Sequence, residues 1–503
     1  MLWRMAVCAI LFCFFWAVSP AQALEKKLTM VFASQMGDIQ NLDQKGGLAE
    51  LATLLQTLRK TDDEVLFFHG GGAFGDFTLS AFDYGAHMVG LLNLVDPAVY
   101  AVAKNDFPHH KDTLSVRTRD AIFPFVSSNL VVANTMNPVN GVKSSAIVHA
   151  HSIPVGFFSL ITSDAENTHI SSALELLDQE VVFSEELTHL KLSGSALNVV
   201  VTDSSLAQIS PSLEHGPDIL FLTAEGATRI SRHGETLVLH QREESSAFVV
   251  TAVFSDADGA LKLLRTEAKI IDLATLQQNA SMADSMSNYV EILEILLNTP
   301  VGHTGVQLET LEDVLNTREN AFASMVAEAM REYYGADIGV INSGFIRGNA
   351  VYPADTQLTR RDLHREFPLH GACEFVATSG RAIELMLENA VSEIEEPQKT
   401  GRFLHVSGLS FVFDPGAEKG ARVSSIKING EPLDKRKEYT LTISSHLGEG
   451  RNGFYMLKTS KRRYTEKPAQ AVSEIVRNYI DRNSPVAPSL SGRITESRSN
   501  PKP

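Results

Sequence analysis

Along the first half of the chain, short apolar runs alternate with amphipathic segments. The apolar runs predict strands at residues 28–33, 65–68, 99–103, 155–162, 197–202 and 219–222. Leucines recur at helical spacing over residues 46–60 and predict a helix there with one apolar face. Buried strands joined by helices are typical of an α/β sheet.

From about Arg229 onward the pattern changes, with short alternating strands such as residues 248–254. Residues 271–290 are polar, and we expect a linker helix there. Further helices are predicted at 321–333, at 382–395 and around Val472 to Tyr479, and strands at 337–342, 403–414, 423–428 and 439–444. Residues 486–503 are rich in Ser, Pro and Arg and are predicted to form a flexible tail.

The N-terminus has the pattern of a secretory signal. Arg4 precedes an apolar run over residues 5–18, and Ala21-Gln22-Ala23 provides small residues at a cleavage site. The run is shorter than the roughly 20 residues that span a bilayer. We therefore predict a signal peptide over residues 1–23, cleaved after Ala23, and a periplasmic or secreted protein; a signal anchor is the alternative. No other run reaches transmembrane length, so no stable membrane span is expected.

The charge balance limits the class of partner. The formal net charge is −16, which argues against nucleic-acid polymers because these need a basic footprint. A small anionic ligand remains compatible with a local arginine cluster. After cleavage only Cys373 remains, so no internal disulfide is expected. The sequence does not indicate a protein partner.

Several ordered motifs in the second half resemble the 5′-nucleotidase family. The family's Arg-Glu-x-Asn, Asn-Gly-Gly-Gly-Ile-Arg and Gly-Gly-Asp-Gly-Phe segments, and two strand motifs, correspond here to Arg318-Glu319-Asn320, Asn342-Ser343-Gly344-Phe345-Ile346-Arg347, Gly450-Arg451-Asn452-Gly453-Phe454, FLHVSGLSFVFD (403–414) and Gly420-Ala421-Arg422-Val423. The resemblance implies a C-terminal α+β substrate-binding domain, placed at residues 291–485.

The resemblance assigns a phosphate- or sugar-recognising corner to Arg318, Asn342 and Arg347. Arginine offers a planar fork of donors suited to phosphate, carboxylate or vicinal hydroxyls, and a glycine-containing loop lets backbone approach a ligand. The alternative is that both arginines form ordinary surface ion pairs.

The part of the family site that stacks on the nucleobase is altered. The two stacking phenylalanines correspond to Leu369 and His446, and the motif's aspartate to Asn452. Base–aromatic stacking contributes roughly 1–3 kcal/mol per base. Substrate-binding positions are thus Arg318, Asn342, Arg347, Leu369, His446 and Asn452, but a purine or pyrimidine ligand is in doubt.

The N-terminal part also resembles the family, through the first strand, the helix after Gly46-Gly47 and the stretch FPFVSSN (123–129). The resemblance implies a four-layer α/β/β/α metallophosphatase-like sandwich over residues 24–270. Family members hold two divalent metals, zinc or manganese, which clamp phosphate and activate a bridging water. The seven ligand positions correspond here to Gln35, Gly37, Gly72, Asn105, Asp203, Ala224 and Gly226.

Only Asn105 among these positions keeps the family's ligand, and one amide is insufficient for two metals. The histidine that assists the leaving group corresponds to Asp106, so no catalytic set is intact and no cofactor is expected. Residues near the relevant loops, which offer a shifted single-metal site as an alternative, are Asp38, His69, Asp76, Asp106, His109, His110 and Asp203. Lys104 introduces a cation beside a former metal position.

Three functions remain open. The first is an exported, catalytically inactive relative that binds a nucleotide-, nucleoside- or sugar-phosphate-like ligand through its C-terminal domain. The second is an active periplasmic 5′-nucleotidase or phosphoesterase of nucleotide catabolism with a rebuilt metal site. The third is a protein-interaction scaffold. The loss of ligands in five separate segments favours the first.

Overall fold

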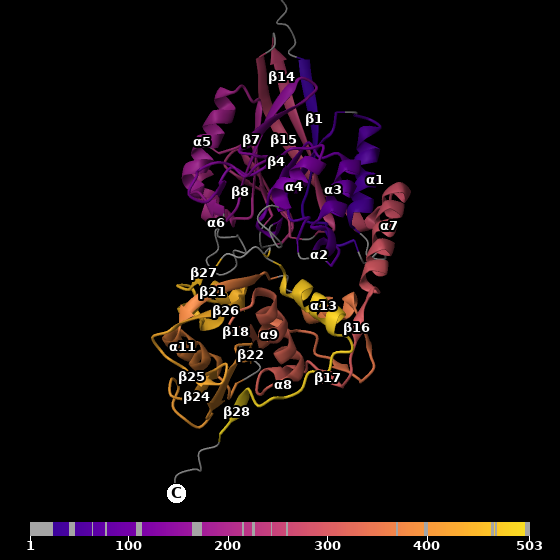
Figure 1. Ribbon diagram of the computed structural model, residues 1–503. Coiled ribbons are helices and arrows are strands. Elements are labelled where there is room, and N and C mark those ends of the chain that lie inside the picture. The colour runs from indigo at the N-terminus through magenta and orange to yellow at the C-terminus, as the bar shows by residue number, and fades with distance from the viewer. Residues whose placement is uncertain are drawn as a thin grey trace, which may run out of the picture. The chain divides into compact units, whose positions relative to one another are not determined.

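The computed structural model describes residues 24–39, 46–62, 64–75, 78–106, 113–162, 174–213, 216–223, 227–242, 244–257, 260–368, 371–396, 401–463, 467 and 470–497. The predicted signal peptide lies outside this part of the chain. Two compact units are present (Figure 1). The first extends to Met286, and the second begins at Ser287 and also takes in the short helix α2 (Ser80–Asp83).

Two β-sheets form the centre of the first unit. One has the order β15 (Ala260–Asp272), β14 (Ser246–Ala257), β1 (Leu24–Ala33), β2 (Leu66–His69), β3 (Val99–Ala101), β4 (Phe125–Val126), β6 (Val142–Lys143). The other has the order β12 (Arg229–His233), β13 (Thr236–His240), β11 (Ile219–Leu222), β10 (Leu197–Thr202), β8 (Ile153–Leu160), β7 (Ser145–Ala150). Strands β1 to β4 are mutually parallel, as are β8, β10, β11 and β13.

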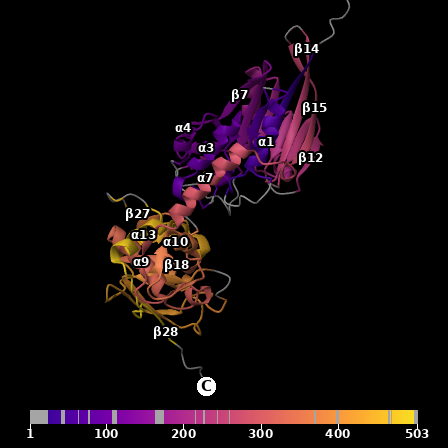
Figure 2. The ribbon, with the colours of Figure 1, turned by 90° about the vertical axis from the view of Figure 1, so that its right-hand side faces the viewer.

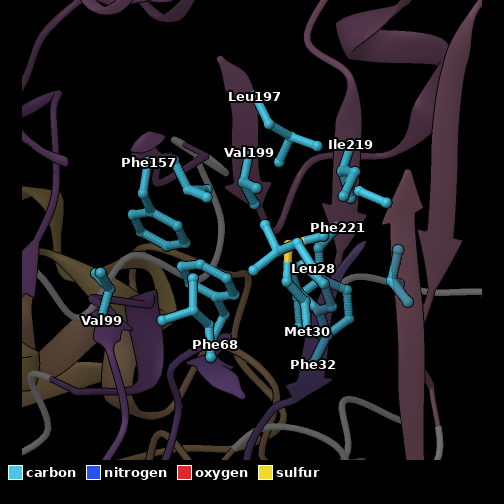
Figure 3. Close-up of a cluster of buried hydrophobic side chains, with 14 of the residues drawn as sticks. Leu28, Met30, Phe32, Phe68, Val99, Phe157, Leu197, Val199, Ile219 and Phe221 are labelled. Atoms are coloured by element: carbon cyan, nitrogen blue, oxygen red, sulfur yellow. The ribbon is translucent and has the colours of Figure 1, made fainter. Parts of the chain in front are cut away.

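Alternating side chains of these strands divide between two kinds of packing. Phe32 and Phe68 point to the facing sheet, where Phe68 stacks on Phe32 and on Phe157 with ring centroids 5.2 and 5.4 Å apart (Figure 3). On the outer face of the second sheet, Phe158 packs edge-on against Phe183 of α5 (Gln179–Leu192). Because successive side chains of a strand point to opposite faces, each strand contributes one set of side chains to the core between the sheets and the other set to the outer face.

Helices complete the four layers. Helices α1 (Leu48–Arg59), α3 (Ala86–Val95) and α4 (Thr113–Asp120) lie on the first sheet's side of the unit, and α5 lies on the opposite side (Figure 1). Figure 2 shows α1 and α3 beside the strands from a second direction. The predicted four-layer α/β/β/α sandwich is therefore confirmed.

The second unit is α+β, as predicted. A five-stranded sheet has the order β22 (Leu404–Ser407), β18 (Ile338–Asn342), β26 (Glu438–Ser444), β21 (Cys373–Ser379), β27 (Lys461–Arg462). A four-stranded sheet has the order β25 (Glu431–Pro432), β24 (Val423–Ile428), β23 (Leu409–Phe413), β28 (Ile494–Glu496). Helix α9 (Ala321–Tyr334) packs on β18 and β22, and α13 (Val472–Asn483) packs on α9. Helix α11 (Gly380–Ala390) contributes to the core that both sheets share.

Two predicted elements differ from the observed ones. The strand expected over 403–414 divides at Gly408, which has a φ of 70° and whose added Cβ would meet the Asp337 carbonyl oxygen at 2.1 Å. Only glycine fits this left-handed, crowded position. The linker helix expected over 271–290 begins and ends later, as α7 (Ala280–Leu297). It begins later because strand β15 continues to Asp272. The boundary between the units falls inside α7, which is one continuous helix (Figure 2).

The prediction of a flexible tail needs correction over residues 486–497. Val486 is buried, and its N–H donates to the His303 carbonyl oxygen at 2.8 Å. Ile494 is also buried, in strand β28, which pairs in parallel with β23. The Ser- and Pro-rich composition concealed these two apolar anchors. No helix in the described part of the chain is long and apolar enough to cross a membrane.

We expect a chain truncated after residue 485 to be destabilised, whereas one truncated after residue 497 keeps the wild-type stability. Fully burying a side chain such as Val486 or Ile494 contributes about 1.5–3 kcal/mol, so the shorter chain loses roughly 3 kcal/mol or more. Thermal and urea unfolding of the two truncations measure this. Equal unfolding midpoints would show that residues 486–497 do not anchor the second unit.

Candidate functional site

The second unit contains a cavity of about 470 Å³ where several loops meet. The contributing segments are the start of α8 (Glu312–Leu315), the turn after β18 (Ser343–Phe345) and the turns that follow β26 (Ser445–Gly448 and Arg451–Gly453). Six lining side chains are amides or hydroxyls, Glu312, Arg347 and His446 add ionisable groups, and Leu315, Phe345 and Ile346 are apolar; the six are Thr310, Asn316, Asn342, Ser343, Asn349 and Asn452. We refer to this space as the amide-rich cavity. Its lining suits a ligand with many hydrogen-bonding groups.

Two buried polar atoms at the end of β18 lack partners in the described structure. The side-chain Nδ2 of Asn342 donates to the Gly401 carbonyl oxygen at 3.0 Å, but its Oδ1 is buried and unpaired. The hydroxyl of Ser343 is also buried and unpaired. Leaving a buried polar atom unpaired costs about 1–3 kcal/mol. A ligand that bonds to these atoms recovers that free energy.

Arg347 supplies the positive charge at this cavity. Its backbone N–H donates to the Glu366 carbonyl oxygen at 2.8 Å, and its Nε donates to the Gly344 carbonyl oxygen at 3.0 Å. These bonds fix the base of the side chain, while the guanidinium is exposed and forms no ion pair with any described residue. The terminal nitrogens are therefore free to bind an anion or vicinal hydroxyls.

His446 and Asn452, from the turns after β26, also line the cavity. Burial, reinforced by the positive charge of Arg451, lowers the pKa of His446 below its ordinary value. The imidazole is thus neutral at pH 7 and acts as a donor and an acceptor. Asn452 adopts a left-handed conformation with a φ of 52°, and its carbonyl oxygen accepts from Asn389 Nδ2 at 3.1 Å.

The predicted substrate residues divide into three groups. Asn342, Arg347, His446 and Asn452 line the amide-rich cavity together. Arg318 is exposed and is not part of the lining, because it follows α8 on the surface. Leu369 lies outside the described residues. The sequence did not identify Asn316 and Asn349 as site residues. Neither stands in a recognised motif, and only the structure places them at the cavity.

In the first unit, Asp106, which the resemblance places at the family's leaving-group histidine, is buried. Its carboxylate accepts hydrogen bonds from the Gly72, Phe74 and Ala103 N–H groups and from the Tyr100 hydroxyl, at 2.8 to 3.2 Å. Burial raises the pKa of Asp106 to about 6, and the four donors oppose that rise. The loop that carries the family's bridging aspartate is thus tied to a side chain of this protein.

Among the other described ligand positions, only Asp203 has a side chain that is hydrogen-bonded to another described residue. The Gln35 N–H donates to the Gly71 carbonyl oxygen at 2.8 Å. Asn105 is exposed within a 3₁₀ turn (Lys104–Asp106). The Oδ1 of Asp203 accepts from the Thr162 N–H at 2.6 Å, and burial raises the pKa of Asp203 while the charge of Lys104 lowers it. Ala224 and Gly226 lie outside the described residues.

The nearby substitutes do not assemble a replacement site in the described structure. The ring of His69 is fully buried, its Nδ1 accepts from the Gly71 N–H at 3.0 Å, and burial lowers its pKa to about 3. Asp38 is exposed. No group of three or more His, Cys, Asp or Glu residues that could hold a metal ion occurs among the described residues. Asp76, His109 and His110 fall outside them. The described donors do not fit two metals.

Known proteins share this architecture. The family described as "5′-nucleotidase, C-terminal domain" matches residues 300–459. Protein 5NUC of Lutzomyia longipalpis is 23% identical over 90% of this chain and 86% of its own length. The 5′-nucleotidase of Mus musculus is 21% identical over 89% and 85%. The chain is thus similar to 5′-nucleotidases along most of its length, and residues 300–459 match the C-terminal domain of that family.

Solved structures of 5′-nucleotidases agree with this fold. A 5′-nucleotidase precursor from Thermus thermophilus matches with a TM-score of 0.53 and 21% identity, covering 94% of this chain and 99% of that one. A putative 5′-nucleotidase from Staphylococcus aureus, in complex with alpha-ketoglutarate, matches with a TM-score of 0.61 and 14% identity, covering 94% and 100%. The two-domain fold of the family is thus retained along the chain.

We expect Asp106→Ala to destabilise the first unit strongly, because it leaves three N–H groups and the Tyr100 hydroxyl buried without an acceptor. Each such loss costs about 1–3 kcal/mol. Tyr100→Phe removes one of the four donors and should cost roughly 1 kcal/mol. Thermal unfolding with Asp120→Ala, an exposed aspartate, as the control measures these effects. An Asp106→Ala variant as stable as that control would contradict the structural role of Asp106.

Proposed function

We propose that this protein is an exported, catalytically inactive member of the 5′-nucleotidase family that binds a small nucleotide-, nucleoside- or sugar-phosphate-like ligand in the amide-rich cavity. The observation that carries the proposal is that three groups line one cavity: the unpaired Asn342 Oδ1, the unpaired Ser343 hydroxyl and the terminal guanidinium nitrogens of Arg347. These atoms offer donors, acceptors and a positive charge within a space of ligand size.

Phosphate or carboxylate groups match Arg347, because guanidinium forms paired, charge-assisted hydrogen bonds with such oxygens. Sugar hydroxyls match the amide-lined part, where Asn342, Asn316 and Asn349 can both donate and accept. Stacking support for a base is weak, because His446 is a small ring and Leu369 cannot stack. The proposal therefore favours the sugar and phosphate portions of a nucleotide as the recognised groups.

The first unit supports the inactive assignment. Hydrolysis in this family depends on a metal pair that generates hydroxide at neutral pH. Here Gly72 has no side chain to bridge two metals, and its N–H is bonded to Asp106, which replaces the catalytic histidine. The carboxylate of Asp203, at another ligand position, accepts a backbone hydrogen bond instead.

Two other functions remain as alternatives. An active phosphoesterase needs a metal site that includes Asp76, His109 or His110 in the loops outside the described residues. A protein-interaction scaffold needs no ligand in the amide-rich cavity. The unpaired atoms of Asn342 and Ser343 favour ligand binding over the scaffold. Export rests on the N-terminal signal pattern, with cleavage after Ala23 and release into the periplasm or medium.

We expect less than about one tenth of an equivalent of zinc or manganese per chain after metal loading and desalting, because the described donors do not form a metal site. Elemental analysis measures this. We also expect no metal-dependent hydrolysis of AMP, UDP-glucose or a generic phosphate ester.

Two tightly held metal equivalents, or turnover that EDTA abolishes and manganese restores, would overturn the inactive assignment. Asn105→Ala is the control for a contaminating nucleotidase, since activity that belongs to this chain must respond to the one retained ligand position.

We expect Arg347→Ala to weaken ligand binding by about 10- to 100-fold, with little change in thermal stability, because charge-assisted hydrogen bonds to arginine contribute roughly 1.5–3 kcal/mol when shielded. A thermal-shift screen with AMP, uridine and glucose 1-phosphate identifies a binding probe, and titration of that probe measures the change. Arg381→Ala, which removes an exposed arginine of α11, is the matched control.

Arg318→Ala distinguishes the family's arrangement from the one observed, in which Arg318 lies outside the cavity lining. It should leave the affinity unchanged. If no probe separates wild type from Arg347→Ala, the scaffold is the function that stands.

A further inference from the structure

A second cavity, of about 430 Å³, lies in the second unit and shares no lining residue with the amide-rich cavity. It is formed by helix α9, helix α13 and the segment that leads from α13 to β28, which Figure 1 shows running past α9. Met325, Val486 and Pro488 give it an apolar floor and rim. None of the family motifs falls among its lining residues.

Arg493 is the one cationic residue in the lining of this cavity, and its guanidinium already has partners within the chain. Arg493 Nη2 forms an ion pair with Glu328 Oε2 at 3.1 Å, its Nη1 donates to the Val406 carbonyl oxygen at 3.1 Å, and its Nε donates to the Ser491 hydroxyl at 2.9 Å. Glu328 is likewise satisfied, because it also accepts from the Ser407 hydroxyl and from Arg331. Arg493 is therefore not available to bind an anion.

The groups that remain are acceptors and an aromatic face. Glu332 lines the cavity, is exposed, and has no hydrogen bond or ion pair with any described residue. Tyr479 is half-buried beside it, and burial, followed by the negative charges of Glu332 and Glu328, raises the pKa of its hydroxyl. Ser324 is 4% exposed, and its buried hydroxyl has no partner in the described structure. Glu328 and Arg493 neutralise each other, so Glu332 is the charged group of the lining that has no ion-pair partner among the described residues.

We propose that this second cavity binds a small organic ammonium ion, with the charged group between the Tyr479 ring and the Glu332 carboxylate and the alkyl part against Met325 and Val486. An aromatic face attracts a cation through its quadrupole, and a nearby carboxylate adds to that attraction. The unpaired Glu332 carboxylate disfavours an anion at the same place. The site does not depend on the function proposed for the amide-rich cavity.

The test is titration calorimetry of the full chain with choline and with its uncharged isostere 3,3-dimethylbutan-1-ol. We expect choline to bind with a dissociation constant of about 0.1–1 mM and the alcohol to bind at least about tenfold more weakly, since only the cation interacts with the ring and the carboxylate. Glu332→Gln and Tyr479→Leu should each weaken choline binding by about tenfold, whereas Tyr479→Phe retains it. Glu291→Gln, at an exposed carboxylate of α7 outside the cavity, is the matched control.

Choline binding that Glu332→Gln reduces and Glu291→Gln does not would support the proposal. Equal affinities for choline and the alcohol, unchanged binding in Glu332→Gln, or no binding at about 10 mM choline would each overturn it. Because Glu332 is exposed and unpaired, its substitution tests the site without disturbing the fold. Thermal unfolding of each variant verifies this, and the comparison of Tyr479→Phe with Tyr479→Leu separates the ring from the hydroxyl.

Discussion

The apolar interface between the two sheets of the first unit determines where its loops meet. Phe68 is stacked between Phe32 of its own sheet and Phe157 of the facing sheet, and this contact fixes the two sheets face to face. Because β1 to β4 are parallel to one another, their carboxyl ends lie at one edge of the first sheet. The turns after β1, β2 and β3 meet at that edge, where Gln35 bonds to Gly71 and Gly72 bonds to Asp106. These turns form the edge at which the resemblance places the family's metal-ligand positions.

Hydrogen bonds within the chain order the described loops at that edge. A metal pair orders its surrounding loops by binding their carboxylates and imidazoles, and loops without metals need another source of order. Asp106 provides it through four hydrogen bonds to Gly72, Phe74, Ala103 and Tyr100. The Asp203 carboxylate does the same for Thr162. Internal hydrogen bonds thus hold the described loops at this edge of the fold.

Much of the fold could be predicted from the sequence because the core strands are short and strongly apolar. Strands β10 and β11 were predicted with their observed ends, and α9 to within one residue. Failures occurred where backbone geometry or distant pairing decides the outcome. Gly408 divides a continuous apolar run because its left-handed conformation turns the chain. Strand β28 has too little apolar content to be recognised, and only pairing with β23 defines it.

The candidate site was harder to predict than the fold. Motif spacing located Asn342, Arg347, His446 and Asn452, which do line one cavity. It also grouped Arg318 with them, although the chain turns that side chain to the surface after α8. No local sequence pattern marks Asn316 and Asn349 as site residues, because asparagine is also common in ordinary turns and loops.

The return of residues 494–496 to β23 has a consequence for how the second unit assembles. Ile494 pairs beside Phe411, and Leu441 of β26 pairs beside Ile338 of β18, so both sheets are completed by residues far apart in sequence. Helices such as α9 form from local contacts, whereas such distant parallel pairings must first close long loops and are intrinsically slow. We therefore expect the helices of the second unit to form before its two sheets are complete. During that interval, the edges of β18 and β23 are open to pairing with other chains.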